Sequence, residues 1–263
     1  MKKTRAASIP SPQSQPETGF QFSRAQFEEL SDLALSHARS LGAQDGGIDV
    51  SEGAGLSVSV RKGELENVER NRDKSLGITL YLGQRRGNAS TSDFSPAAIR
   101  RTVQAAYDIA RFTAEDPVAG LPDEQDIAND YPDLDLFHPW AVTPEEAMQI
   151  ALRCEAAAFA TSKKISNSEG AGVSAQQSHF FTEHMRGGER GRSGIFRGGY
   201  ASSRHSFSVA PIAGRGANMQ RDAWFSSMRS PAELASPEAV GRYAAERALS
   251  RLKPRKVATT ECP

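Results

Sequence analysis

The chain has 263 residues, with 32 lysines and arginines against 32 aspartates and glutamates, so its formal net charge is zero. This balance excludes a global electrostatic attraction to nucleic acid or to an anionic membrane. Hydrophobic residues make up 38% and charged residues 24% of the sequence, which is typical of a globular protein. Two isolated cysteines and the absence of an apolar leader or membrane-length stretch predict a cytoplasmic protein.

The chain is expected to begin with a disordered tail and a helix. Residues 1–21 contain three prolines and little apolar surface, so we expect them to be disordered. Ser23 and Gln26 have the spacing of a capping box, which starts a helix. Apolar residues at helical spacing extend this helix to about Leu41.

Residues 54–92 predict an antiparallel meander with one buried and one solvated face. Apolar and polar residues alternate, and glycine-containing turns separate the runs. A second helix begins at Ser95 and Pro96, because proline is favoured at the first helical position. The expected fold class is therefore α+β, with helices packed on one face of a meander sheet, and its first domain is residues 22–112. The expected strands are 56–60, 65–68 and 76–82.

The second half of the chain is expected to repeat this α+β character. Residues 113–142 are acidic and proline-rich, which predicts a connector. Thr143 starts a third helix, and residues 143–255 form the second α+β region, which ends in a helix that starts near Ser236. Residues 256–263 resemble the first part of a strand that is not completed. We therefore expect the chain to be the N-terminal portion of a longer protein.

One cluster offers the side chains of a zinc site, namely His179, Glu183 and His184. The two histidines are five residues apart, which separates them by about 140° on a helix and places them on opposite faces of a strand. The sequence has no H-E-x-x-H, nucleophile elbow, Walker loop or dinucleotide fingerprint. We assign no catalytic, cofactor-binding or metal-ligating residue to the chain, and a self-sufficient zinc hydrolase remains an alternative.

A second cluster is rich in arginine and glycine. It comprises Arg186–Arg192 and Arg197–Tyr200, and the loop spans residues 186–199. Such segments can follow single-stranded nucleic acid, so RNA binding is another alternative. The sequence has only two arginine–glycine–glycine triplets, and the chain carries no net positive charge. Both facts disfavour nucleic acid as the partner.

Four segments together resemble the PmbA (also called TldE) side of the TldD/PmbA family. They are Ser57–Glu66, Ser75–Ile78, Asn167–Ala171 and Arg197–Ser206, and the resemblance extends over about residues 22–263. It implies a cytoplasmic, two-subunit zinc metalloprotease, once called a modulator of DNA gyrase, that processes or degrades small unstructured peptides. It also implies that the zinc ligands belong to a TldD-type partner and that this chain encloses the substrate without a cofactor of its own.

The segment from Tyr200 to Val209 carries the densest part of this resemblance. We expect it to contribute to the wall of the substrate chamber or to the contact with the partner. The candidate contact residues are Arg197, Tyr200, Arg204 and His205. A nonfunctional truncated product is the remaining alternative, and the sequence does not identify the peptide.

Overall fold

The computed structural model describes residues 19–128, 130–187, 196–256 and 258–261. The helices are α1 (Arg24–Ser40), α2 (Pro96–Phe112), α3 (Pro144–Thr161) and α4 (Pro237–Ser250). The strands are β1 (Asp45–Arg61), β2 (Glu64–Leu82), β3 (Arg85–Thr91), β4 (Ile165–Met185), β5 (Phe196–Gly198), β6 (Ala201–Ala213), β7 (Gln220–Arg221) and β8 (Trp224–Met228).

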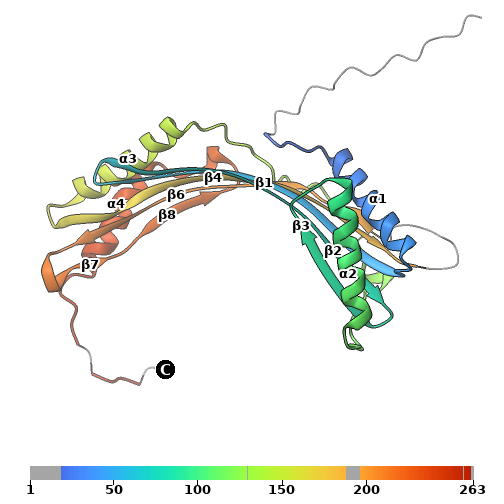
Figure 1. Ribbon diagram of the computed structural model, residues 1–263. Helices are drawn as coiled ribbons and strands as arrows, with labels where there is room; N and C mark the ends of the chain where they lie inside the picture. Colours follow the sequence, from blue (N-terminus) through green and yellow to red (C-terminus); the bar gives the residue numbers. More distant parts are fainter. Residues whose placement is uncertain (1–18, 129, 188–195, 257, 262–263) are drawn as a thin grey trace, which may run out of the picture.

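The strands of the described residues form one antiparallel sheet. Its order is β3-β2-β1-β4-β6-β7, with β5 also paired to β4 and β8 to β6. The sheet is drawn as a long arch, with α1 and α2 near one end and α3 and α4 near the other (Figure 1). β1 and β4, of 17 and 21 residues, run side by side through both ends. The expected regions 22–112 and 143–255 therefore share a single sheet.

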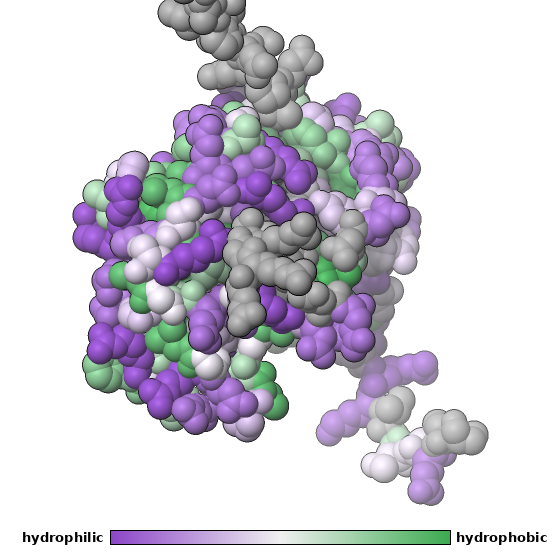
Figure 2. Space-filling model, turned by 90° about the vertical axis from the view of Figure 1, so that its right-hand side faces the viewer, coloured by the Kyte–Doolittle hydropathy of each residue, from purple (hydrophilic) through white to green (hydrophobic). Residues whose placement is uncertain are grey.

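All four helices pack on the same face of this sheet, as the sequence predicted. Ile48 and Val50 of β1 are buried with α1 and α2, whereas Val58 and Val60 are buried with α3 and α4. These residues are separated by even numbers along one strand, so their side chains lie on one side. The α+β fold class is confirmed. On the view of the α1–α2 end, hydrophilic residues separate small apolar patches (Figure 2).

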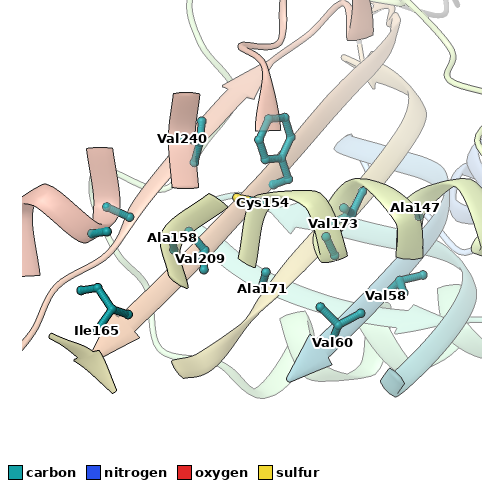
Figure 3. Close-up of a cluster of buried hydrophobic side chains, with 14 of the residues drawn as sticks. Val58, Val60, Ala147, Cys154, Ala158, Ile165, Ala171, Val173, Val209 and Val240 are labelled. Atoms are coloured by element: carbon teal, nitrogen blue, oxygen red, sulfur yellow. The ribbon is translucent and has the colours of Figure 1, made fainter. Parts of the chain in front are cut away.

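The core at the α3–α4 end is built from small side chains that let the two helices approach closely. A Cβ added to Gly241 of α4 would collide with the backbone of Cys154 on α3. Cys154 lies within this core beside Val240 and Ala158 (Figure 3). Burial raises the pKa of the Cys154 thiol to about 12, so this cysteine is an unreactive packing residue.

Helix α3 also fixes the turn between β1 and β2. The Glu155 carboxylate is buried and accepts hydrogen bonds from the backbone N–H groups of Lys62 (3.0 Å) and Gly63 (2.8 Å). Both turn residues have positive φ angles, of 54° and 80°, which suits a tight hairpin turn. The turn expected at these positions is confirmed.

The structure corrects the expected strand boundaries. The strands expected at 65–68 and 76–82 are parts of the single strand β2, which has 19 residues. Residues 64–73 are exposed on both faces, so no alternation of burial marks this part, yet its backbone pairs with β1. β1 likewise begins at Asp45, well before the expected start.

The expectations for the two ends of the chain also change. Residues 1–18 lie outside the described part, but Phe20 is buried and the backbone of Gln21 and Phe22 is hydrogen-bonded to Glu52. Residues 19–21 are therefore held against the sheet, contrary to the expectation, and the rest of the expected tail is outside the described residues. At the other end, residue 256 and residues 258–261 form no strand, because no described strand pairs with them.

Candidate functional site

The face of the sheet opposite the helices, here called the polar face, carries mainly short polar side chains. Its central register row is Ser57 on β1, Ser174 on β4 and Ser206 on β6. All three are half-buried, unlike the apolar residues that alternate with them. Further members of this face are Ser51, Ser59, Gly172, Ser178, Ser202 and Ser208.

Arg204 lies on the polar face in a row that crosses four strands. Its neighbours across the sheet are Gln176 on β4, Gly55 on β1 and Asn71 on β2. A Cβ at Gly55 would meet the terminal amide atoms of Gln176 and Asn71, so the glycine leaves the space in which these two amides lie. Arg204 donates from Nε to Ser227 Oγ at 2.8 Å. A hollow of about 230 Å³ lies over this row.

Tyr200 and Arg204, two of the expected contact residues, lie at the surface. Tyr200 is 41% exposed, and its ring packs edge-on against Phe180 with centroids 5.2 Å apart. Tyr131 of the connector packs on Tyr200 at 6.2 Å. An aromatic cluster therefore lies four positions along the chain from Arg204, and both Tyr200 and Arg204 can reach another molecule.

Arg197, the third expected contact residue, already bridges two elements. Its Nη2 is 2.7 Å from Asp32 Oδ1 on α1, and its Nε is 3.2 Å from Glu183 Oε2 on β4. Glu183 is buried and also accepts a 2.6 Å hydrogen bond from Ser31 Oγ. This arginine fixes α1 to the sheet.

His205 is a correction to the expected contact set. Its side chain points to the helix side and is only 1% exposed, so it is not presented with Arg204 on the outer surface where a partner was expected to bind. Its Nε2 lies 2.8 Å from the carbonyl oxygen of His138, and Trp140 packs edge-on against its ring. His205 thereby holds the connector against β6. Arg204 and His205 are adjacent in the sequence but point to opposite faces of β6, because side chains alternate along a strand.

Strand geometry also separates the three residues of the zinc alternative. His179 and Glu183 of β4 face the helices, whereas His184 faces the opposite side. His179 Nε2 lies 3.4 Å from Glu52, and Glu183 is committed to Arg197. These residues therefore do not fit a shared zinc ion.

Most of the arginine- and glycine-rich loop lies outside the described residues, because the structure describes nothing from 188 to 195. Arg186, at its start, donates from Nη2 to the carbonyl oxygen of Pro122 at 2.8 Å. This contact ties the end of β4 to the connector.

A buried network at the centre of the sheet escaped the sequence analysis. Glu52 of β1 is 1% exposed and accepts hydrogen bonds from Gln21 N (2.9 Å), Phe22 N (3.1 Å) and Arg72 Nη1 (2.8 Å). Its fourth neighbour, His179, is stacked between Phe20 and Phe27 with ring centroids at 4.1 and 4.4 Å. The only sequence signal for this network is Glu52 itself, an acidic residue at a position of β1 where the alternating pattern places buried residues.

Burial and hydrogen bonding shift the pKa values of this network in opposite directions. Burial is the largest single effect and raises the pKa of the Glu52 carboxyl, but the hydrogen bonds from Gln21, Phe22, His179 and Arg72 together outweigh it, and the net pKa is below the ordinary value. Burial lowers the pKa of His179 despite the neighbouring carboxylate. The pair is thus a carboxylate beside a neutral imidazole at pH 7.

We expect the stability of the chain to fall in mild acid. Burial lowers the pKa of both His179 and His205 below 6.5, so the unfolded chain binds protons first as the pH falls. The contribution of these two histidines to the free energy of unfolding should be constant above about pH 7.5 and decrease below 6.5, by up to about 1.4 kcal/mol per pH unit for each histidine. Urea unfolding between pH 7.5 and 5.5 measures this slope.

The matched comparison is the double variant His179→Gln, His205→Gln. Its free energy of unfolding should decrease less with falling pH than that of the wild type, whatever the absolute stability of the variant. A flat wild-type profile, or an unchanged slope in the double variant, would contradict the assignment.

The chain matches two domains of one peptidase family. Residues 48–110 match PmbA/TldA metallopeptidase domain 1, and residues 137–252 match the PmbA/TldA metallopeptidase central domain. Metalloprotease PmbA of Escherichia coli O157:H7 is 46% identical over 231 residues, which cover 88% of this chain and 49% of that protein. A metalloprotease PmbA homolog of Haemophilus influenzae is 39% identical over 243 residues, which cover 91% of this chain and 52% of that protein.

Solved structures share the fold at low sequence identity. A protein of Bacteroides thetaiotaomicron described as a modulator of DNA gyrase has a TM-score of 0.75 at 20% identity, covering 89% of this chain and 52% of its own. TldE of Thermococcus kodakarensis has a TM-score of 0.65 at 13% identity, covering 84% of this chain and 47% of its own.

These domains place the chain among the metallopeptidase-type proteins. It belongs to the TldD/PmbA family as a PmbA-type member. The chain spans about half the length of the curated relatives it matches. Among the described residues, no helix is both long enough and apolar enough to cross a bilayer.

Proposed function

We propose that this chain is the PmbA-type part of a cytoplasmic, two-subunit peptidase that processes or degrades small unstructured peptides. In this proposal the chain encloses the peptide and contacts a TldD-type partner, which carries the zinc. The observation that supports it most is the polar face, which has few apolar side chains, whereas the opposite face carries the apolar residues that pack against the four helices.

The polar face suits an extended peptide of any sequence. Serine hydroxyl groups both donate and accept hydrogen bonds, as the amides of Gln176 and Asn71 also do. Main-chain amides of a bound peptide can therefore find partners directly or through water. A folded protein has few free main-chain groups to offer, so such a face favours unstructured substrates.

The zinc chemistry is assigned to the partner because the candidate residues of this chain do not fit the metal. His179, Glu183 and His184 point to two faces of β4, and two of them are engaged by other groups. Bound in the partner, zinc would polarise the scissile carbonyl and activate water. This chain's residues would hold the peptide and limit access to that site.

Arg204→Ala tests the role of the polar face in the full-length protein paired with its TldD-type partner. We expect kcat/KM for an unstructured peptide to fall about tenfold, because one charge-assisted hydrogen bond is lost. The matched control is Arg100→Ala on the exposed surface of α2, which should leave cleavage unchanged. Co-purification reports partner contact separately, and unchanged pairing together with unchanged cleavage would refute the assignment of Arg204.

The partner is tested by affinity purification of the tagged chain from its own cells. Recovery of a TldD-type chain with an H-E-x-x-x-H motif supports the subunit role. Failure to recover such a chain, both with this chain and with a full-length version, would refute it. Salt-sensitive retention of nucleic acid would instead favour the RNA-binding alternative, which the peptidase relatives do not support.

A further inference from the structure

A cavity of about 490 Å³ lies on the helix side of the sheet. Its floor is formed by Ala54 and Leu56 of β1 and Ala175 of β4. Residues 140–142 of the connector and Thr143, the N-cap of α3, form a wall, and Gly19 of the N-terminal segment also lines it. Because the α1–α2 and α3–α4 pairs pack at opposite ends of the sheet, no helix covers this central stretch (Figure 1).

One register row runs along the floor of this cavity and ends in two polar groups. Arg70 on β2 is opposite Leu56, Leu56 is opposite Ala175, and Ala175 is opposite His205 on β6. Neighbouring strands are about 4.8 Å apart, so the two ends of the row are about 14 Å apart. The floor is therefore an apolar strip with a cation at one end and an imidazole at the other.

The imidazole end has an unused hydrogen-bond acceptor. His205 Nε2 donates to the His138 carbonyl oxygen at 2.8 Å, which leaves the neutral ring with its lone pair on Nδ1. Nδ1 is buried and has no hydrogen-bond partner among the described residues. A buried acceptor without a donor is costly, so a group that donates to Nδ1 would be favoured.

The cation end has an unpaired charge. Arg70 is exposed, and its side chain makes no hydrogen bond or ion pair with the described residues. The neighbouring Arg72 is already held by Glu52 and by the carbonyl oxygen of Gly19. Arg70 is thus available to a ligand anion, and a carboxylate is the geometric match for a guanidinium group.

We propose that this cavity binds a short, extended peptide of about four residues through its free C-terminal carboxylate. The carboxylate pairs with Arg70, apolar side chains lie over Leu56 and Ala175, and an N–H group donates to His205 Nδ1. Four extended residues span about 14 Å, which matches the row. Trp140, which packs on the His205 ring, shifts to admit the donor.

This site lies on the side of the sheet opposite the polar face and does not depend on that face binding substrate. Hydrolysis of a peptide bond gives the released fragment a new C-terminal carboxylate. An internal segment of an intact peptide has no such group. The cavity therefore selects cleaved fragments over internal segments of an intact peptide.

Trp140 reports on the cavity directly. The chain has two tryptophans, and Trp224→Phe leaves Trp140 as the single emitter. In this variant of the present chain, we titrate N-acetyl-Ala-Leu-Ala-Leu with a free carboxylate and the same peptide as its C-terminal amide. We expect a saturable change in Trp140 fluorescence with the carboxylate form, and at least about tenfold weaker binding of the amide.

Arg70→Gln separates this site from nonspecific association. It should weaken binding of the carboxylate form about tenfold and leave the amide form unchanged, whereas Arg100→Gln should alter neither. No fluorescence response, equal binding of the two peptides, or an unchanged affinity in Arg70→Gln would overturn the proposal. Because the assay involves neither a partner nor cleavage, its failure would leave the proposed peptidase role untouched.

Discussion

Replacing Glu52 with leucine is expected to lower the free energy of unfolding by about 3 kcal/mol. The carboxylate is buried and is the acceptor for two backbone N–H groups and for Arg72. Leucine has a similar volume but leaves these donors unpaired, and removing one partner of a buried charged network typically costs about 3–5 kcal/mol. We take the lower end because the Arg72 side chain is 40% exposed and can turn to water.

Urea unfolding followed by circular dichroism measures this loss, and Glu66→Leu is the matched control. Glu66 lies on the exposed half of β2 and makes no side-chain hydrogen bond or ion pair with the described residues. Its replacement should change stability by less than about 0.5 kcal/mol. Amide exchange at Gln21 and Phe22 should also accelerate in the Glu52 variant. A Glu52→Leu protein as stable as the control would show that the network does not hold the N-terminal segment.

Gly87→Ala is expected to cost about 2–3 kcal/mol through direct overpacking. Gly87 of β3 faces α2, and an added Cβ would collide with the backbone oxygen of Ala106 and the backbone nitrogen of Ala110. Backbone atoms within a helix cannot turn aside as the end of a side chain can. The methyl group would therefore push α2 away from β3 and loosen the core around it.

Gly77→Ala provides the control on the neighbouring strand. Gly77 of β2 has no atom within 4 Å of an added Cβ and has an ordinary strand conformation. This change should be neutral or slightly stabilising, because alanine restricts the unfolded chain more than glycine does. Thermal or urea unfolding of both variants gives the comparison. Equal stabilities would mean that α2 can move at little cost.

The sequence by itself determined where the helices start. Ser23 and Thr143 each form the capping box that their spacing predicted, with Gln26 and Glu146 as the partners. Proline stands in the first turn of α2, α3 and α4, as expected. These features are local, since a cap is made by residues three positions apart. The fold class and the family resemblance were also accessible, because both rest on patterns along the chain.

Only the tertiary structure decided which residues form the candidate sites. Arg204 and His205 are neighbours in sequence, yet one faces solvent and the other is buried beneath the connector. Glu52 is an ordinary acidic residue in the sequence, and its burial depends on Arg72 of the next strand and on the N-terminal segment that crosses it.

The rows that define the polar face and the cavity were equally inaccessible from the sequence. Asn71, Gly55, Gln176 and Arg204 meet only because four strands align in one register. A shift of one residue in any pairing would turn that strand's side chains to the other face. Local patterns predict that a strand exists and which of its residues share a face, whereas the pairing of distant strands places those faces together.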